Sequence, residues 1–187
     1  EMRSKISWRM ESNDGLNLFT YACPSDNPPK SIICLVHGHG EHIERYAHVS
    51  QQFNDAGYSC VGFDHRGHGQ SEGVRGHTPS YEVLLDDIEI FLNQVARDYP
   101  GVPRFLYGHS MGGNLAINYV LRRKPDLAGV ISTSPWLKLA FEPPAIQVFL
   151  GKTMNKVFPA FIQASGLETS ALSRDPEIVR AYEEDLL

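Results

Sequence analysis

Two serines lie in the pattern G-x-S-x-G, which can supply a nucleophile for acyl transfer. One is Ser71, within residues 69–73, and the other is Ser110, within residues 108–112. In this pattern the serine occupies a sharp turn between a strand and a helix, and the two glycines leave room for strained backbone. Ser110 follows the apolar residues 105–107 and precedes a helical pattern, whereas Ser71 has polar loop sequence on both sides. The sequence therefore predicts Ser110, and not Ser71, as the nucleophile.

Acyl transfer also needs an oxyanion hole, a pair of backbone N–H groups at the position where negative charge develops on the substrate oxygen. The residue after the nucleophile, Met111, is expected to supply one of them. The second is expected from the loop that follows the apolar strand ending at Val36, and we assign it to the N–H of His39. Gly38 and Gly40 flank His39 and allow the backbone to turn its N–H groups inward.

The same loop permits a second interpretation as a metal site. His37, His39 and His42, with Glu41 between the last two, resemble the H-x-H-x-D-H zinc motif of the metallo-β-lactamase superfamily. Such a site needs further ligands from later in the chain, but His109 is the last of the eight histidines. The serine pattern would also be left without a role. A metal-dependent hydrolase is thus the remote alternative, and neither a metal nor another cofactor is predicted.

A serine hydroxyl becomes a good nucleophile only when a histidine takes its proton and a carboxylate orients that histidine. In the strand–serine–helix arrangement these partners follow the serine, in the order serine, acid, histidine. No histidine follows Ser110 in this sequence. His109 precedes it directly, so its side chain is expected to point away from the hydroxyl. We expect the chain to stop before the strands that carry the acid and the base, and to be inactive alone. A non-catalytic fragment or binding module is the alternative.

Strand patterns and helix patterns alternate along residues 1–134. Alternating segments at 5–10 and 17–22 flank the turn sequence 12–15, which predicts an antiparallel hairpin. Strands that alternate with helices at this spacing are typical of βαβ units, so we expect an α/β class with a mainly parallel sheet and helices on both faces. Further strands are expected at 31–36, 59–63, 104–107 and 129–133. Helices are expected at 46–56, from the cap and first-turn pair Thr78-Pro79 to near residue 99, and at 111–123.

Composition excludes several classes of protein. The net charge is −5, and no basic run is longer than residues 122–124, so a nucleic-acid partner is not expected. No stretch reaches the ~18 apolar residues of a transmembrane helix, and the first residues lack the apolar segment of a signal peptide. The three cysteines, Cys23, Cys34 and Cys60, are an odd number and two of them lie in apolar runs, which indicates reduced thiols and a cytoplasmic location.

Three segments together resemble the monoacylglycerol lipase, or lysophospholipase, group of α/β-hydrolases. They are HGHGEH at residues 37–42, FDHRGHGQSEG at 63–73 and GHSMGG at 108–113. The resemblance extends over nearly the whole chain, although His39 stands where smaller residues are common. It implies an α/β-hydrolase core with a helical cap. It also implies hydrolysis of a single-chain lipid ester, of monoacylglycerol or lysophospholipid type, through an acyl-enzyme on Ser110. Asp64 and Arg66 are then structural residues of their loop.

The sequence pattern changes at Pro135. Between Pro135 and Ile162, 16 of 28 residues are apolar and prolines interrupt any long helix. We therefore predict a core at 1–134 and a cap at 135–187, with a short helix starting at residues 175–176. The apolar side chains of the cap either pack on the core, line an acyl tunnel or meet a membrane peripherally. The candidate acyl-binding residues are Phe149, Leu150 and Phe158, and the rest of the fold is expected outside this chain.

Overall fold

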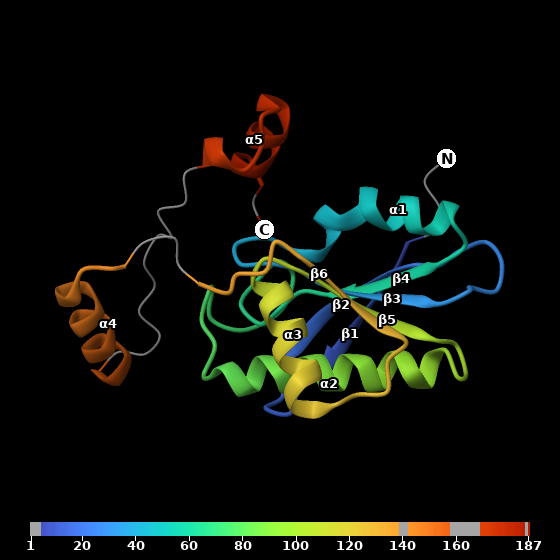
Figure 1. The fold of residues 1–187 in the computed structure, drawn as a ribbon, viewed down its shortest axis with the longest axis horizontal. Helices are drawn as coiled ribbons and strands as arrows, with labels where there is room; N and C mark the ends of the chain where they lie inside the picture. Colours follow the sequence, from blue (N-terminus) through green and yellow to red (C-terminus); the bar gives the residue numbers. More distant parts are fainter. Residues whose placement is uncertain (1–4, 139–141, 158–168, 186) are drawn as a thin grey trace.

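The computed structural model describes residues 5–138, 142–157, 169–185 and 187. Its six strands form one sheet in the order β1-β2-β4-β3-β5-β6 (Figure 1). The first two strands form an antiparallel hairpin, β2 also pairs antiparallel with β4, and the other neighbours are parallel. This confirms the predicted hairpin and the mainly parallel sheet. The strands are β1 Ile6–Glu11, β2 Asn17–Cys23, β3 Ile32–Val36, β4 Ser59–Phe63, β5 Arg104–His109 and β6 Gly129–Thr133.

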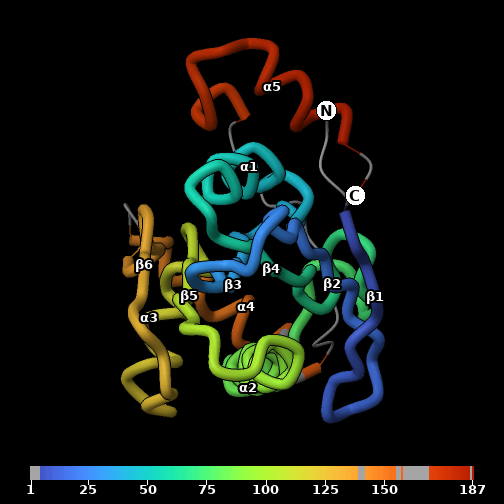
Figure 2. Tube along the Cα trace, turned by 90° about the vertical axis from the view of Figure 1, so that its right-hand side faces the viewer, coloured from blue at the N-terminus to red at the C-terminus, as the bar shows by residue number. Residues whose placement is uncertain are grey.

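Helices cover both faces of the sheet, as predicted (Figure 2). On one face lie α1 (Ala47–Asp55) and the 3-10 turn η1 (Ile43–Tyr46) that precedes it, and on the other lie α2 (Tyr81–Asp98) and α3 (Met111–Arg123). Each face has its own apolar cluster. Every residue of β3 and β4 is buried, because a strand covered on both sides excludes water from all its side chains. Continuous apolar sequence in these two strands is the expected consequence.

The other two parallel strands are less buried than their sequences suggest. The segment at 104–107 reads as a buried strand, yet most residues of β5 are half-exposed. In β6, which lies at one edge of the described sheet, Val130 is exposed. Apolar sequence alone does not tell how completely the neighbouring elements cover a strand.

Side-chain hydrogen bonds cap the start of α2 and of the last helix, whereas α1 and α3 start without one. The hydroxyl of Ser80 accepts the Val83 N–H and caps α2, so the predicted start at Thr78-Pro79 is wrong by two residues. Thr78 lies outside the helix, and its hydroxyl donates to the carbonyl of Ser80 instead. The expected start of the last helix is confirmed: the Asp175 carboxylate accepts the Glu177 N–H at 2.9 Å, and a proline occupies the first helical position.

Beyond β6 the described residues form α4 (Ala145–Val157), η2 (Thr169–Ala171) and α5 (Pro176–Glu183). Figure 1 shows α4 well apart from the sheet, whereas α5 lies on the α1 side of the molecule. The end of α5 is fixed to the loop after β3, since the Tyr182 hydroxyl donates to the Gly40 carbonyl at 2.9 Å. Phe158 falls outside the described residues. Among the helices that are described, none is both long and apolar enough to cross a bilayer.

Candidate active site

Ser110 occupies the turn between β5 and α3, where the sequence predicts it. Its backbone has φ 53° and ψ −117°, which is strained for a residue other than glycine. The turn is possible because the residues two positions before and after Ser110 are glycines. A Cβ on Gly108 would lie 2.2 Å from the Gly112 carbonyl oxygen, and one on Gly112 would lie 2.1 Å from the Val36 carbonyl oxygen. The turn is held by the Ser110 N–H, which donates to the Thr133 carbonyl at 3.0 Å.

Ser71 has a structural environment instead. It lies in the loop after β4, where its hydroxyl donates to the Asp64 carbonyl at 2.6 Å and accepts the Phe19 N–H at 2.8 Å. These bonds tie the loop to β2. The second serine pattern therefore forms a loop contact in the structure, without the strand and helix that the pattern needs for chemistry.

The loop after β3 runs directly beside Ser110. A Cβ on Gly38 would lie 3.2 Å from the Ser110 Cβ, so the two backbones are in close approach. The carboxylate of Glu41 accepts the Gly38 N–H, and the Tyr46 hydroxyl donates to the same carboxylate at 2.8 Å. The residues predicted to form the oxyanion hole, His39 and Met111, thus lie on the two backbone segments that meet at Ser110.

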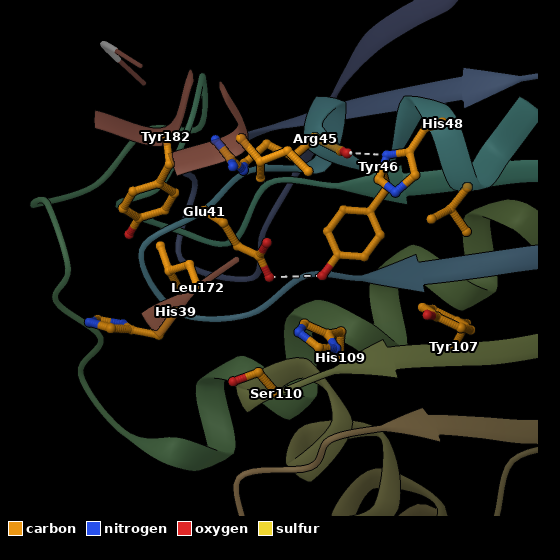
Figure 3. A pocket seen from close by; sticks show the side chains of 12 residues that line it. His39, Glu41, Arg45, Tyr46, His48, Tyr107, His109, Ser110, Leu172 and Tyr182 are labelled. Carbon is orange, nitrogen blue, oxygen red and sulfur yellow. Dashed lines mark hydrogen bonds between the residues drawn. The ribbon is translucent and has the colours of Figure 1, made fainter. Parts of the chain in front are cut away.

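A cavity of about 520 Å³ opens over Ser110 (Figure 3). Of the predicted site residues, Ser110 and His39 line it. Phe149 and Leu150 do not: their side chains are 66% and 53% exposed on α4, so the structure does not place these candidate acyl-binding residues at the cavity. The lining residues are His39, Glu41, Arg45, Tyr46, His48, Val49, Tyr107, His109, Ser110, Leu172, Ile178 and Tyr182.

Leu172, Ile178 and Tyr182 are the contribution of the cap segment to this cavity, and sequence reasoning did not select them. The available signal is the extent of the resemblance, which covers nearly the whole chain and so includes this segment. Asp185 fixes this segment: its carboxylate lies 2.9 Å from His42 Nε2 and accepts from Arg45 at 3.1 Å. Partial burial alone would raise the pKa of Asp185, but the hydrogen bond from His42, supported by Arg45, lowers it below its usual value.

The histidines of the metal interpretation have separate partners. His37 is fully buried, and both of its ring nitrogens are engaged within the protein. The ring of His39 packs on His68 with 5.5 Å between centroids, and His42 faces Asp185. Within the described ranges, no three His, Cys, Asp or Glu side chains are placed to hold a metal ion. The geometry therefore gives no support to the metal-dependent alternative.

His109 lines the cavity beside Ser110 in Figure 3. Its Nδ1 lies 3.0 Å from the Thr133 hydroxyl, which fixes the ring toward β6. No hydrogen bond in the described part of the chain joins its ring to Ser110.

Comparison with known proteins identifies relatives of this chain in sequence and in fold. The family described as "Serine aminopeptidase, S33" matches residues 27–187. The chain is 35% identical over 160 residues to a monoacylglycerol lipase of Mycolicibacterium smegmatis, covering 86% of this chain, and 36% identical over 175 residues to a monoglyceride lipase of Rattus norvegicus, covering 93%. It spans 57% of the length of each. The crystal structure of a Paleococcus ferrophilus monoacylglycerol lipase is also similar, at 35% identity and a TM-score of 0.79, with 91% of this chain and 63% of that chain covered.

Proposed function

This chain belongs to the serine aminopeptidase S33 family of α/β-hydrolases, within its monoacylglycerol lipase group, and from this premise we propose that Ser110 is the nucleophile of a carboxylic ester hydrolase. One observation carries the proposal: the strained Ser110 turn lies beside the glycine-rich loop and opens into a cavity. A serine in such a turn presents its hydroxyl to a substrate and not to its own backbone.

The proposed reaction is acyl transfer in two steps. The Ser110 Oγ attacks the ester carbonyl carbon while a base takes the hydroxyl proton, and the resulting oxyanion is met by the N–H groups of His39 and Met111. Departure of the alcohol, with a proton, leaves an acyl-enzyme, which water hydrolyses to free acid and regenerated serine. Among the described residues around Ser110, none is placed to act as the base. The activity is therefore proposed for the full-length protein.

The proposed substrate is a single-chain lipid ester. Two features support it: the similarity to proteins named as monoacylglycerol lipases, and a cavity that combines apolar side chains from Val49, Leu172 and Ile178 with the charged groups of Glu41 and Arg45. Hydrolysis of a monoacylglycerol and of a lysophospholipid with the same acyl chain, measured side by side, separates the two head-group classes. Equal activity toward a triacylglycerol would contradict the single-chain assignment.

Covalent labelling tests the nucleophile. A fluorophosphonate probe should label the full-length protein on the peptide that contains Ser110, as read by mass spectrometry. Ser110→Ala should abolish labelling, whereas Ser71→Ala is the matched control from the other serine pattern and should keep it. Label on Ser71 would contradict the assignment. Hydrolysis that resists the probe but is lost on chelation, together with stoichiometric zinc, would favour the metal-dependent alternative.

The apolar side of α4 supports a proposal about where the protein meets its substrate. Along this helix Ile146, Phe149, Leu150 and Val157 are exposed, at the spacing of one helix face. We propose that this face contacts lipid surfaces peripherally. In liposome flotation with anionic vesicles the protein should rise with the lipid.

The flotation assay has a matched control within the chain. The double variant Phe149→Ser/Leu150→Ser should stay largely at the bottom of the gradient. Leu121→Ser removes an equally exposed apolar side chain from α3 and should float like the unaltered protein. Equal flotation of the α4 double variant and the unaltered protein would contradict the proposed contact.

A further inference from the structure

Two buried histidines, His37 and His65, have no role in the chemistry proposed for Ser110. His37 opens the loop after β3, and His65 lies in the loop after β4. We propose that His37, held by His65, is a positioning residue that sets the direction of the oxyanion-hole N–H of His39. The inference rests on the proposed function of Ser110 and adds a role for the loop after β4, which otherwise holds no chemistry.

The hydrogen bonds fix the protonation of His37. Its Nε2 accepts the backbone N–H of His65 at 2.9 Å. A neutral imidazole that accepts at one nitrogen donates from the other, so the proton is on Nδ1. That Nδ1 lies 2.7 Å from the Gly38 carbonyl oxygen, which can only accept. His37 therefore donates to the Gly38 carbonyl. A second proton, on Nε2, would point at the His65 N–H and break the hydrogen bond that Nε2 accepts.

His65 holds the His37 segment through a second bond. Its Nε2 lies 3.1 Å from the His37 carbonyl oxygen, so its proton is on Nε2. The two rings meet edge to face with 4.4 Å between centroids, and both are fully buried. Burial lowers the pKa of His65 to about 3 and keeps the pKa of His37 well below its usual value, with the neighbouring imidazoles acting in the same direction. Both rings are neutral, and each has one fixed donor.

The direction of the His39 N–H follows from the geometry of the peptide bond. In a trans peptide the carbonyl and the following N–H point in opposite directions, and none of the described residues has a cis peptide. Since the Gly38 carbonyl is held toward the His37 ring, the His39 N–H is turned away from that ring. The Gly38 N–H is also held, by the Glu41 carboxylate. Both polar groups of Gly38 are thus fixed at the residue that touches Ser110.

The His39 N–H itself has no hydrogen-bond partner within the described residues. His39 lines the cavity at Ser110. A donor that is unpaired, belongs to a residue lining the cavity and has its peptide fixed from behind is what an oxyanion hole requires, because stabilisation of developing charge depends on donors that need no reorganisation.

Two substitutions at residue 37 separate positioning from packing. In His37→Asn the side-chain amide nitrogen can take the place of Nδ1 and donate to the Gly38 carbonyl. In His37→Gln the amide oxygen can take the place of Nε2 and accept from His65, but the bond to Gly38 is lost. Each variant keeps one of the two bonds, so their melting temperatures should be similar. In the full-length protein we expect His37→Asn to retain kcat within a few fold, and His37→Gln to lower kcat about 10²-fold with KM changed little. Equal losses in kcat, or wild-type kcat in His37→Gln, would overturn the proposal.

A spectroscopic measurement tests the same point without activity. Nitrogen-15 NMR of the histidine rings should find His37 as the Nδ1–H tautomer and His65 as the Nε2–H tautomer, both unchanged between about pH 8 and pH 5. A protonated His37, or the opposite tautomer, would overturn the inference. Failure of the fluorophosphonate to label Ser110, with these tautomers present, would instead contradict the proposed function. The two failures are therefore distinguishable.

Discussion

Replacement of Arg66 by leucine is expected to lower the free energy of unfolding by about 3–5 kcal/mol. The Arg66 side chain is 2% exposed and that of Asp87 is 1% exposed. Arg66 donates from Nε and Nη2 to the two Asp87 oxygens at 2.8 and 2.9 Å, and from Nη1 and Nη2 to Asp14 at 2.7 and 3.0 Å. Without the guanidinium, the Asp87 carboxylate stays buried with no cation. Burial already raises the pKa of Asp87, and Arg66 is the group that opposes this.

Equilibrium unfolding in urea measures the loss, and the chain provides a matched control. Arg123 on α3 also pairs with acidic residues, here Glu82, Asp86 and Glu89, but at the surface. Such pairs contribute little, so Arg123→Ala should cost less than about 1 kcal/mol. The double variant Arg66→Leu/Asp87→Leu should recover part of the stability lost in Arg66→Leu, because no unpaired charge remains buried and Asp14 is exposed to water. Similar losses of unfolding free energy in Arg66→Leu and Arg123→Ala would show that burial does not set the energetic contribution of the Arg66–Asp87 pair.

The partners of Arg66 in this ion-pair network could not be predicted from the sequence. The resemblance to lipases assigned Arg66 to the structure of its loop, and its contacts agree with that assignment. Its partners are Asp14, in the hairpin turn, and Asp87, on α2, at sequence separations of 52 and 21 residues. Nothing in the local pattern pairs them, because the pairing depends on the sheet order that brings β2 beside β4.

The elements themselves were more predictable than their contacts. Periodicity located the hairpin, the parallel strands and the helices, because it reports which side of each element is buried. The Ser110 turn was equally visible, since its glycines and its position between a strand and a helix are local features. Composition did not distinguish apolar residues that line a cavity from those that are exposed. Composition favours Phe149 and Leu150 as acyl-binding residues, and this stays a prediction; the apolar side chains that line the described cavity come from Val49, Leu172 and Ile178.

Acidification below about pH 6.5 is expected to destabilise the fold through His37 and His65. In the unfolded chain both have ordinary pKa values near 6.5, whereas in the folded protein burial lowers the pKa of His65 to about 3 and that of His37 well below 6.5. The unfolded state therefore binds more protons than the folded state in this range. The stabilisation is complete above about pH 6.5 and is lost progressively as the pH falls toward the folded-state values.

The expected slope is about 1.4 kcal/mol per pH unit for each of the two histidines, once the pH is well below 6.5. Unfolding free energies measured between about pH 7 and pH 5 report on these two rings together with His68, whose pKa is also lowered by burial, so the contribution of each ring is read from its own variant. His65→Gln keeps a donor toward the His37 carbonyl but cannot be protonated, so it should reduce the slope by the contribution of one histidine, about 1.4 kcal/mol per pH unit. Loss of the packed ring should also lower stability at pH 7. His48→Gln, at an exposed position on α1, should leave the slope unchanged. A stability independent of pH in this window would mean that the two buried rings accept protons in the folded state, which would also remove the fixed tautomer on which the orientation of the His39 N–H depends.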